Sequence, residues 1–355
     1  MTGPRKRLDP AIFNLPVERM RQGYYSDKYF VRAREVLVAD HHHPRVLMQV
    51  FGKEHAYLGG VDEAIAILKL CSLEWPALQV HALFDGDEVA PWETVMTIEG
   101  PYEAFAHLET LYLGVLARRT RVGTNTRLVV EAAKPKEVMF FPARHDHWLV
   151  QTGDGYAAHI AGAIGVSTDA QASWWGSEGV GTVPHGMIAA YGGDTTLATR
   201  RFAELMPAHV RLITLVDFDN DCVSTSLNVA RALGERLYGV RLDTAETMVD
   251  QSVIPQMGRF RPTGVNPQLV WNVRQALDAE GFRHVKIVVS GGFTVEKIRQ
   301  FERAGVPVDA YGVGSSLFGG QGRFDFTADV VMVDGRPCAK VGREHQPNSR
   351  LEEVI

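Results

Sequence analysis

The chain has 355 residues, of which 45% are hydrophobic and 22% charged, the balance of a globular protein with one large domain or two moderate ones. The net charge of −5 gives no general attraction to nucleic acid or to an anionic membrane, and no apolar run approaches the roughly 20 residues that span a bilayer. The three cysteines lie far apart, which argues against a disulfide framework or a zinc ribbon, and the basic start lacks the apolar core of a signal peptide, so we expect a cytoplasmic protein.

Residues 1–127 are predicted to form an N-terminal α/β domain. Arg45–Phe51 and Thr94–Ile98 have the apolar pattern of strands. Val61–Leu70 repeats apolar residues at helical spacing, and Pro101–Val115 alternates apolar and polar positions like an amphipathic helix.

From about residue 137, short apolar runs alternate with helical segments. The runs lie at 138–141, 164–168, 210–218, 237–243, 285–292 and 309–315. The helical segments between them include Gly155–Ala163, Ser224–Glu235, Pro267–Ala279 and Val295–Ala304. This alternation is typical of parallel strands covered on both faces. We therefore predict an irregular, incomplete β/α barrel of six or seven strands over residues 128–325.

The last segment, residues 326–355, leaves this rhythm. Asp329–Val333 and Cys338–Val341 are joined at Asp334-Gly335, and Asp-Gly between two apolar runs predicts a hairpin. We expect this tail to return to the N-terminal domain and complete it.

Two glycine motifs follow the last predicted strands of the barrel, Ser290-Gly291-Gly292 and Gly312-Val313-Gly314-Ser315. Glycine lets backbone N–H groups approach an anion closely, and the loops after the last two strands of such barrels often hold phosphate. Alternatively, these glycines only form tight turns. Two successive motifs favour phosphate binding.

Carboxylates and one histidine stand at other predicted strand ends. Asp217 and Asp243 are placed to hold Mg²⁺ or ribose hydroxyls, although Asp217 alternatively caps the following helix. His185, between Pro184 and Gly186, is placed for nucleophilic or acid–base work, whereas a lone histidine is more often an ordinary structural residue.

Cationic and aromatic clusters add candidates for binding. Arg144 lies beside His145, and guanidinium groups bind phosphate and carboxylate through two parallel hydrogen bonds. A second arginine cluster covers residues 118–121; most such clusters are solvated faces. Near the N-terminus, Tyr24, Tyr25 and Tyr29 either pack in a core or stack on a flat heteroaromatic ring.

Taken in order, these segments resemble the nicotinate phosphoribosyltransferase family, among the type II pyridine phosphoribosyltransferases. The resembling stretches run in family order from about residue 23 to 318 and are GYYSDKYF, IEGPYE to LARRTRVGTNTR, FFPARHDH, GVSTDA, GTVPHGM, LVDFDND, GVRLDT, IVVSGGF and AYGVGSSLF. The resemblance implies that nicotinate and phosphoribosyl pyrophosphate give nicotinate mononucleotide and pyrophosphate in NAD biosynthesis, with Mg²⁺ and with ATP hydrolysis coupled to the reaction. It also implies homodimers or larger homo-oligomers with shared active sites.

Carried over by position, the motifs imply three groups of site residues. The substrate-binding group comprises Tyr25 (stacked on the pyridine ring), Arg144, His145, Thr168 and Arg241. The phosphate-binding group comprises Ser290, Gly291, Gly292, Gly312, Gly314 and Ser315. The catalytic group comprises His185, which ATP would convert to phosphohistidine, and Asp217 and Asp243, which would face ribose and Mg²⁺.

Three departures from the family pattern keep alternatives open. His145 stands where the family often has arginine, and Asp169 stands where asparagine is expected. A carboxylate near the ring would repel nicotinate and favour an amide. The cysteine-rich zinc segment of some members is missing. The alternatives are a nicotinamide- or quinolinate-specific phosphoribosyltransferase, or a non-catalytic barrel that binds a phosphorylated metabolite.

Overall fold

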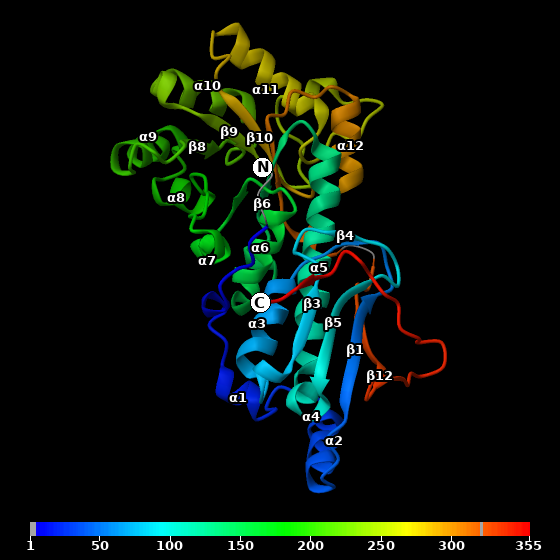
Figure 1. Cartoon of the computed structure of the whole chain (residues 1–355). Coiled ribbons are helices and arrows are strands. Elements are labelled where there is room, and N and C mark those ends of the chain that lie inside the picture. The colour runs from blue at the N-terminus through cyan, green and yellow to red at the C-terminus, as the bar shows by residue number, and fades with distance from the viewer. Residues whose placement is uncertain (1–4, 320–321) are drawn as a thin grey trace. The chain divides into compact units, whose positions relative to one another are not determined.

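The computed structural model describes residues 5–319 and 322–355, which form two compact units (Figure 1). The first unit comprises Met1–Asn125, Tyr156–Ala161 and Gln321–Ile355, and the second comprises Thr126–Gly155 and Gly162–Gly320. Helix α5 (Glu109–Ala133) begins in the first unit and ends in the second. Over the described ranges, no helix is both long enough and apolar enough to cross a membrane.

The first unit is built on a six-stranded sheet in the order β13-β12-β1-β5-β3-β14, with antiparallel pairing throughout. Its strands are β1 (Arg45–Gly52), β3 (Gln79–Ala82), β5 (Thr94–Pro101), β12 (Phe326–Val333), β13 (Arg336–Pro337) and β14 (Glu352–Glu353). A separate pair joins β2 (Ala56–Tyr57) to β4 (Glu88–Val89). The helices include α1 (Val17–Arg21), α2 (Lys28–Ala39), α3 (Val61–Cys71) and α4 (Tyr102–Phe105).

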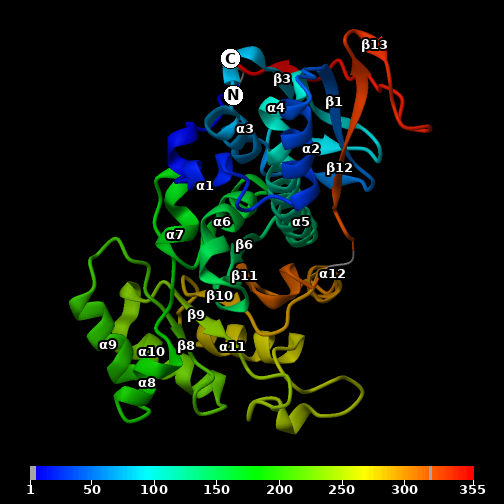
Figure 2. The ribbon, with the colours of Figure 1, turned by 90° about the horizontal axis from the view of Figure 1, so that it is seen from below.

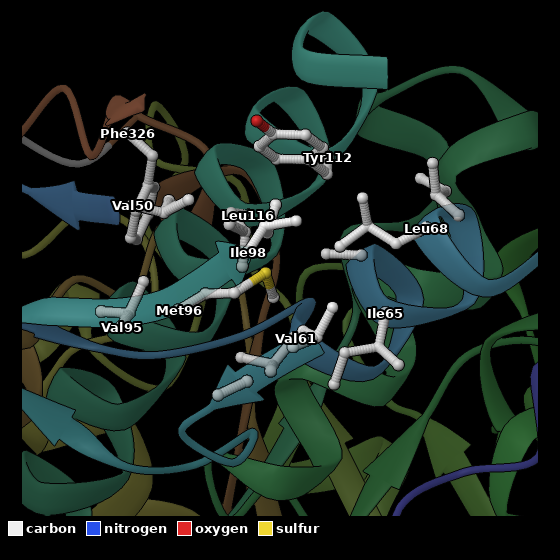
Figure 3. Close-up of a cluster of buried hydrophobic side chains, with 14 of the residues drawn as sticks. Val50, Val61, Ile65, Leu68, Val95, Met96, Ile98, Tyr112, Leu116 and Phe326 are labelled. Carbon is white, nitrogen blue, oxygen red and sulfur yellow. The ribbon is translucent and has the colours of Figure 1, made fainter. Parts of the chain in front are cut away.

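Helices α3 and α5 supply apolar side chains to the core of this unit, together with the strands of the sheet (Figure 3). Met96 and Ile98 share one face of β5 because side chains alternate along a strand. They pack in the same buried cluster as Leu68 of α3 and Leu116 of α5, each of which is fully buried. The apolar residues that repeat at helical spacing in the sequence are thus the residues that fill this core.

The tail adds strands to this sheet. β12 pairs with β1 from Val46↔Val333 to Gly52↔Phe326, and β14 pairs with β3. The predicted hairpin is confirmed: Asp334 and Gly335 both have positive φ, as a two-residue turn between twisted strands requires. The second strand of the hairpin is Arg336–Pro337, however, and not Cys338–Val341.

The second unit contains a curled sheet of six parallel strands in the order β7-β6-β11-β10-β9-β8. The strands are β6 (Glu137–Phe140), β7 (Gly165–Val166), β8 (Ile213–Leu215), β9 (Gly239–Leu242), β10 (Lys286–Val289) and β11 (Ala310–Val313). Each of the six predicted runs overlaps one of them, so the predicted α/β fold with a partial barrel is confirmed. Met139, Ile213, Val288 and Ala310 form its buried interior cluster.

An irregular segment links the two edges of this sheet. The Val180 N–H donates to the carbonyl of Val166 in β7 at 2.7 Å, and the Val183 N–H donates to the carbonyl of Ile213 in β8 at 2.9 Å. Residues 180–183 therefore act as a seventh member of the barrel. Helices α9 (Thr195–Leu205), α10 (Cys222–Leu233), α11 (Pro267–Ala279) and α12 (Val295–Arg303) lie around the outside of the sheet (Figure 2).

A buried histidine makes the stability of the first unit depend on pH. His107 is fully buried, and burial lowers the pKa of its imidazole to about 4, with a smaller contribution from the charge of Arg34. Because the folded pKa lies below the unfolded value, stability is fully present above about pH 6.5 and is lost as the pH falls toward 4. Between pH 8 and pH 5, the unfolding free energy of the parent should fall by about 2 kcal/mol more than that of the His107→Leu variant.

Urea unfolding at the two pH values measures this difference. His42→Leu, at an exposed position, is the matched control and should follow the parent protein. An equal pH dependence in the His107→Leu variant and the parent would show that His107 does not contribute.

Candidate active site

A cavity of about 580 Å³ lies at the carboxyl ends of the parallel strands in the second unit. Parallel strands end at the same edge of a sheet, so the loops that follow them meet there. The cavity is lined by most of the residues that the sequence singles out: Arg144, His145, His185, Arg241, Asp243, Ser290, Gly291, Gly292, Gly312, Gly314 and Ser315. The sequence pattern of strand ends therefore located the cavity.

Asp217 lies behind this lining and contacts it through His185. The Nε2 atom of His185, the first residue of α8 (His185–Ala190), is 3.0 Å from Oδ1 of Asp217. The aspartate side chain is 8% exposed and the imidazole 42% exposed. Burial raises the pKa of Asp217 above its usual range, while the neighbouring imidazole opposes this rise.

This contact defines the chemistry open to His185. An ionised carboxylate accepts a hydrogen bond, so the proton of a neutral imidazole is assigned to Nε2. The lone pair of Nδ1 is then left for a nucleophilic or hydrogen-bonding role in the cavity. Asp217 thus orients the ring that the sequence indicated.

Arg241 connects three segments of the site. Its Nε donates to Oγ of Ser290 at 2.8 Å, and its Nη2 is 3.5 Å from Oδ2 of Asp243. Ser290 in turn donates to Oδ1 of Asp243 at 2.7 Å, and Nη1 of Arg241 donates to Thr182 at 3.4 Å. Burial lowers the pKa of Arg241, which stays cationic because the guanidinium group is such a strong base. The network fixes the end of β9 against the Ser290 loop and the bridging segment.

Arg144 differs from Arg241 in having its guanidinium available. It follows β6 in a single helical turn (Ala143–His145) and has no hydrogen-bond or ion-pair partner in the part of the chain that the structure describes. Its charge contributes to the lowered pKa of Arg241, so two cations act on one cavity. A planar guanidinium in such a place is suited to a carboxylate or phosphate of a ligand.

The glycine loops supply backbone donors. Within residues 5–319 and 322–355, the N–H groups of Gly291, Gly292, Gly314 and Ser315 donate to no acceptor. Gly291 and Gly292 have φ of +84° and +68°, a conformation that favours glycine. Successive amides in such turns form concave sites for anions. The cavity therefore combines cations with unpaired amide donors.

Besides Asp217, two other predicted residues do not line the cavity. Thr168 caps α7 (Asp169–Ala172) by accepting the N–H of Gln171 at 3.2 Å, and it donates to Gln151 at 2.9 Å. Its neighbour Ser167 lines the cavity instead. Tyr25 belongs to the first unit, where it is 43% exposed and lines a separate pocket of about 290 Å³. Its role in stacking on a ring stays a prediction.

Asp169, the departure that pointed to an amide substrate, is held by the backbone. Its Oδ1 accepts the N–H of Gly179 at 2.9 Å, and it is not among the residues that line the cavity. The carboxylate thus stabilises the loop before the bridging segment. Its effect on the choice between a charged and an amide ring stays a prediction.

The carboxylates do not form a metal cage by themselves. Among the residues described, no group of three or more His, Cys, Asp or Glu side chains is arranged to hold a metal ion. Asp243 lines the cavity, whereas Asp217 is buried against His185. With this donor set, Mg²⁺ fits only where Asp243 and the substrate phosphates bind it together. Mg²⁺ is usually bound in this way.

Sequence reasoning missed several lining residues. They include Phe141, Ser167, Thr182, Phe293 and Ser316. Phe141 ends the predicted run at 138–141, and Phe293 directly follows the run at 285–292, so neither was singled out as a site residue. Ser167 and Thr182 lie close to residues that the motifs did single out, so the motifs marked the correct loops without fixing which side chain faces inward.

Comparisons with known proteins agree with this architecture. Residues 27–120 match the family model of the quinolinate phosphoribosyl transferase N-terminal domain, and residues 122–320 match that of its C-terminal domain. The chain is 29% identical over 280 residues to a nicotinate phosphoribosyltransferase of Mycobacterium tuberculosis, a match that covers 76% of this chain and 57% of that protein. The chain thus spans little more than half the length of this curated relative.

Solved structures show the same fold. The nicotinate-nucleotide pyrophosphorylase from Pyrococcus furiosus is 32% identical, with a TM-score of 0.80 over 96% of this chain and 85% of that chain. Human nicotinic acid phosphoribosyltransferase, at 16% identity, has a TM-score of 0.67 over 90% of this chain and 77% of that chain, which shows a shared fold.

Proposed function

The chain belongs to the quinolinate phosphoribosyl transferase family, and on that premise we propose that it makes nicotinate mononucleotide and pyrophosphate from nicotinate and phosphoribosyl pyrophosphate in NAD biosynthesis. One observation carries the proposal. A single cavity holds unpaired backbone amides beside the available guanidinium of Arg144 and the carboxylate of Asp243. These groups match the diphosphate, the ring carboxylate and the ribose of the two substrates.

The reaction needs orientation more than proton transfer. The lone pair of the pyridine nitrogen forms a bond to C1 of the ribose, while the bond from C1 to the pyrophosphate oxygen breaks and the leaving group takes that electron pair. The amides of Gly291, Gly292, Gly314 and Ser315 stabilise the departing pyrophosphate. Asp243 would hold the ribose and would supply one ligand to Mg²⁺, an ion that neutralises pyrophosphate charge when it is bound. The cavity walls hold both substrates in line.

Recognition of one ring carboxylate is assigned to Arg144. Among the described residues that line the cavity, Arg241 is already tied to Asp243 and Ser290, which leaves Arg144 as the arginine available for a ligand. One available guanidinium matches nicotinate, with one carboxylate, better than quinolinate, with two. His145 is the second candidate for this contact.

Replacing Arg144 by Gln should raise KM for nicotinate about 30-fold, because a charged hydrogen-bonded pair of about 2 kcal/mol is lost. Turnover of nicotinamide, which carries no charge, should change little. Steady-state kinetics with nicotinate, nicotinamide and quinolinate, each with and without ATP, measure both effects.

Two variants serve as controls for this test. Arg283→Gln removes an exposed arginine outside the cavity and should leave all constants unchanged. Asp169→Asn keeps an acceptor for Gly179 and should leave the preference for nicotinate intact. A parent enzyme that prefers nicotinamide or quinolinate would assign the other base and leave the reaction class standing.

Coupling to ATP is proposed to act through His185. Its Nδ1 would attack the γ-phosphorus of ATP, the bond to the bridging oxygen would break, and ADP would leave. The phosphoimidazole adds roughly two negative charges, which recruit Mg²⁺ or arginine and favour a closed loop arrangement. Asp217 supports this step because its carboxylate accepts a hydrogen bond from Nε2–H of His185. The lone pair of Nδ1 then remains for the attack.

The His185→Asn variant should lose ATP hydrolysis and ATP stimulation while it keeps basal transferase activity. Acid-quenched reactions with γ-labelled ATP should show an acid-labile protein phosphate in the parent and none in the variant. ATP hydrolysis in the variant that still accompanies product formation would rule out His185 as the acceptor.

We also propose that the enzyme is a cytoplasmic homodimer or higher oligomer, with Tyr25 acting on a neighbouring subunit's ring site.

A further inference from the structure

The peptide between Gly291 and Gly292 has its two polar groups on opposite sides. In a trans peptide the carbonyl of one residue and the N–H of the next point in opposite directions. The carbonyl of Gly291 accepts a hydrogen bond from Nζ of Lys297 at 3.3 Å. The N–H of Gly292 therefore points away from Lys297, and no acceptor in the described ranges takes it.

Lys297 acts from outside the site. It does not line the active-site cavity but borders a second cavity of about 550 Å³, and Gly292 lies between the two because it lines both. The ammonium group is 4.2 Å from the ring centroid of Phe293 and 6.0 Å from that of Phe301. The two rings are themselves packed edge to face at 5.0 Å, so the ammonium rests on a rigid support.

The position of Lys297 is not explained by the helix that carries it. It lies in the first turn of α12, where the positive end of the helix dipole disfavours a cation. Burial lowers the pKa of its ammonium, and Arg261 adds to this effect while Glu246 opposes it. The groups that favour the charged ammonium here are the carboxylate of Glu246, the carbonyl of Gly291 and the aromatic rings.

We infer that Lys297 is a positioning residue: it holds the Gly291 carbonyl outward and so presents the Gly292 N–H to the pyrophosphate in the cavity. The inference rests on the proposed function, in which this loop binds the pyrophosphate of the substrate. Without Lys297, two glycines in sequence allow the peptide to rotate and to turn the carbonyl toward the anion.

The test compares Lys297→Met with Lys297→Arg, which keeps a donor for the carbonyl. Lys297→Met should raise KM for phosphoribosyl pyrophosphate and Kd for inorganic pyrophosphate, measured by calorimetry, by about 10- to 100-fold. KM for nicotinate should stay within about twofold of the parent, whereas kcat should also fall, because the Gly292 N–H stabilises the departing pyrophosphate. Lys286→Met, which removes an exposed lysine paired with Asp309, is the control and should change neither constant.

A crystal structure of the Lys297→Met variant gives a readout that does not depend on activity. We expect the Gly291–Gly292 peptide to be rotated in the variant and restored in Lys297→Arg. An unrotated peptide with unchanged pyrophosphate affinity overturns the inference, as does an equal loss of all kinetic constants together with a lower melting temperature. If the parent enzyme transfers phosphoribosyl groups to no pyridine base, the proposed function fails, while pyrophosphate binding and the peptide orientation still decide the role of Lys297.

Discussion

Replacement of Arg241 by Met should lower kcat/KM for phosphoribosyl pyrophosphate by about 100- to 1000-fold. The Arg241 side chain is 19% exposed, and its guanidinium contacts Ser290, Asp243 and Thr182. Its removal leaves a partly buried carboxylate uncompensated, a change that typically costs about 3–5 kcal/mol. The Ser290 loop and the carboxylate of Asp243, which is proposed to hold the ribose, are then no longer linked by a shared partner.

Steady-state kinetics and thermal melting together measure this effect. Arg241→Lys keeps the charge but lacks the fork that reaches several partners, so its activity should lie between the parent and the Met variant. Arg231→Met removes an exposed arginine paired with Glu280 and should leave kinetics unchanged. A folded Arg241→Met enzyme within about threefold of the parent would contradict the role assigned to this network.

Replacement of Gly291 by Val should raise KM for phosphoribosyl pyrophosphate by about 100-fold, because two charged hydrogen bonds worth about 3 kcal/mol are lost together. Gly291 has φ of +84°, and a Cβ there would lie 3.3 Å from Oδ1 of Asp243. The loop must therefore move away from its present conformation, and its amides lose their common direction.

Gly281→Val is the matched control for backbone strain. Gly281 has φ of +87° at the end of α11, and a Cβ there meets nothing within 4 Å. Both variants should lose similar stability in urea, but only the Gly291 variant should lose affinity for phosphoribosyl pyrophosphate. Equal KM values for the two variants would mean that Gly291 serves only the turn.

The fold was predictable where local pattern and packing agree. The helix predicted at Pro267–Ala279 has those bounds in the structure, because proline suits its first position and Asn266 caps it by accepting the Leu269 N–H. The buried parallel strands are continuous apolar runs, which set them apart from the helices between them. Their ends in turn marked the loops that form the cavity.

Other features depend on contacts between distant residues. The bridging segment 180–183 is too short to stand out as a strand and is fixed by hydrogen bonds to β7 and β8. Helix α5 continues to Ala133, past the predicted end at Val115, although two glycines weaken its helical pattern.

The same limit applies to the site. Lys297 has the sequence context of a solvated helix face, and only the folded chain brings it to the carbonyl of Gly291. For Asp169 the motif gives the loop but not the direction of the side chain, which the contact with Gly179 fixes.

The proposed reaction in this cavity is the transfer of a phosphoribosyl group to nicotinate. The most direct measurement is the formation of nicotinate mononucleotide and pyrophosphate by the purified parent protein from nicotinate, phosphoribosyl pyrophosphate and Mg²⁺, followed by chromatography. We expect equal amounts of the two products, with a rate that ATP increases. Consumption of neither substrate, while the folded protein still binds pyrophosphate, would refute the proposed transfer and indicate a non-catalytic barrel.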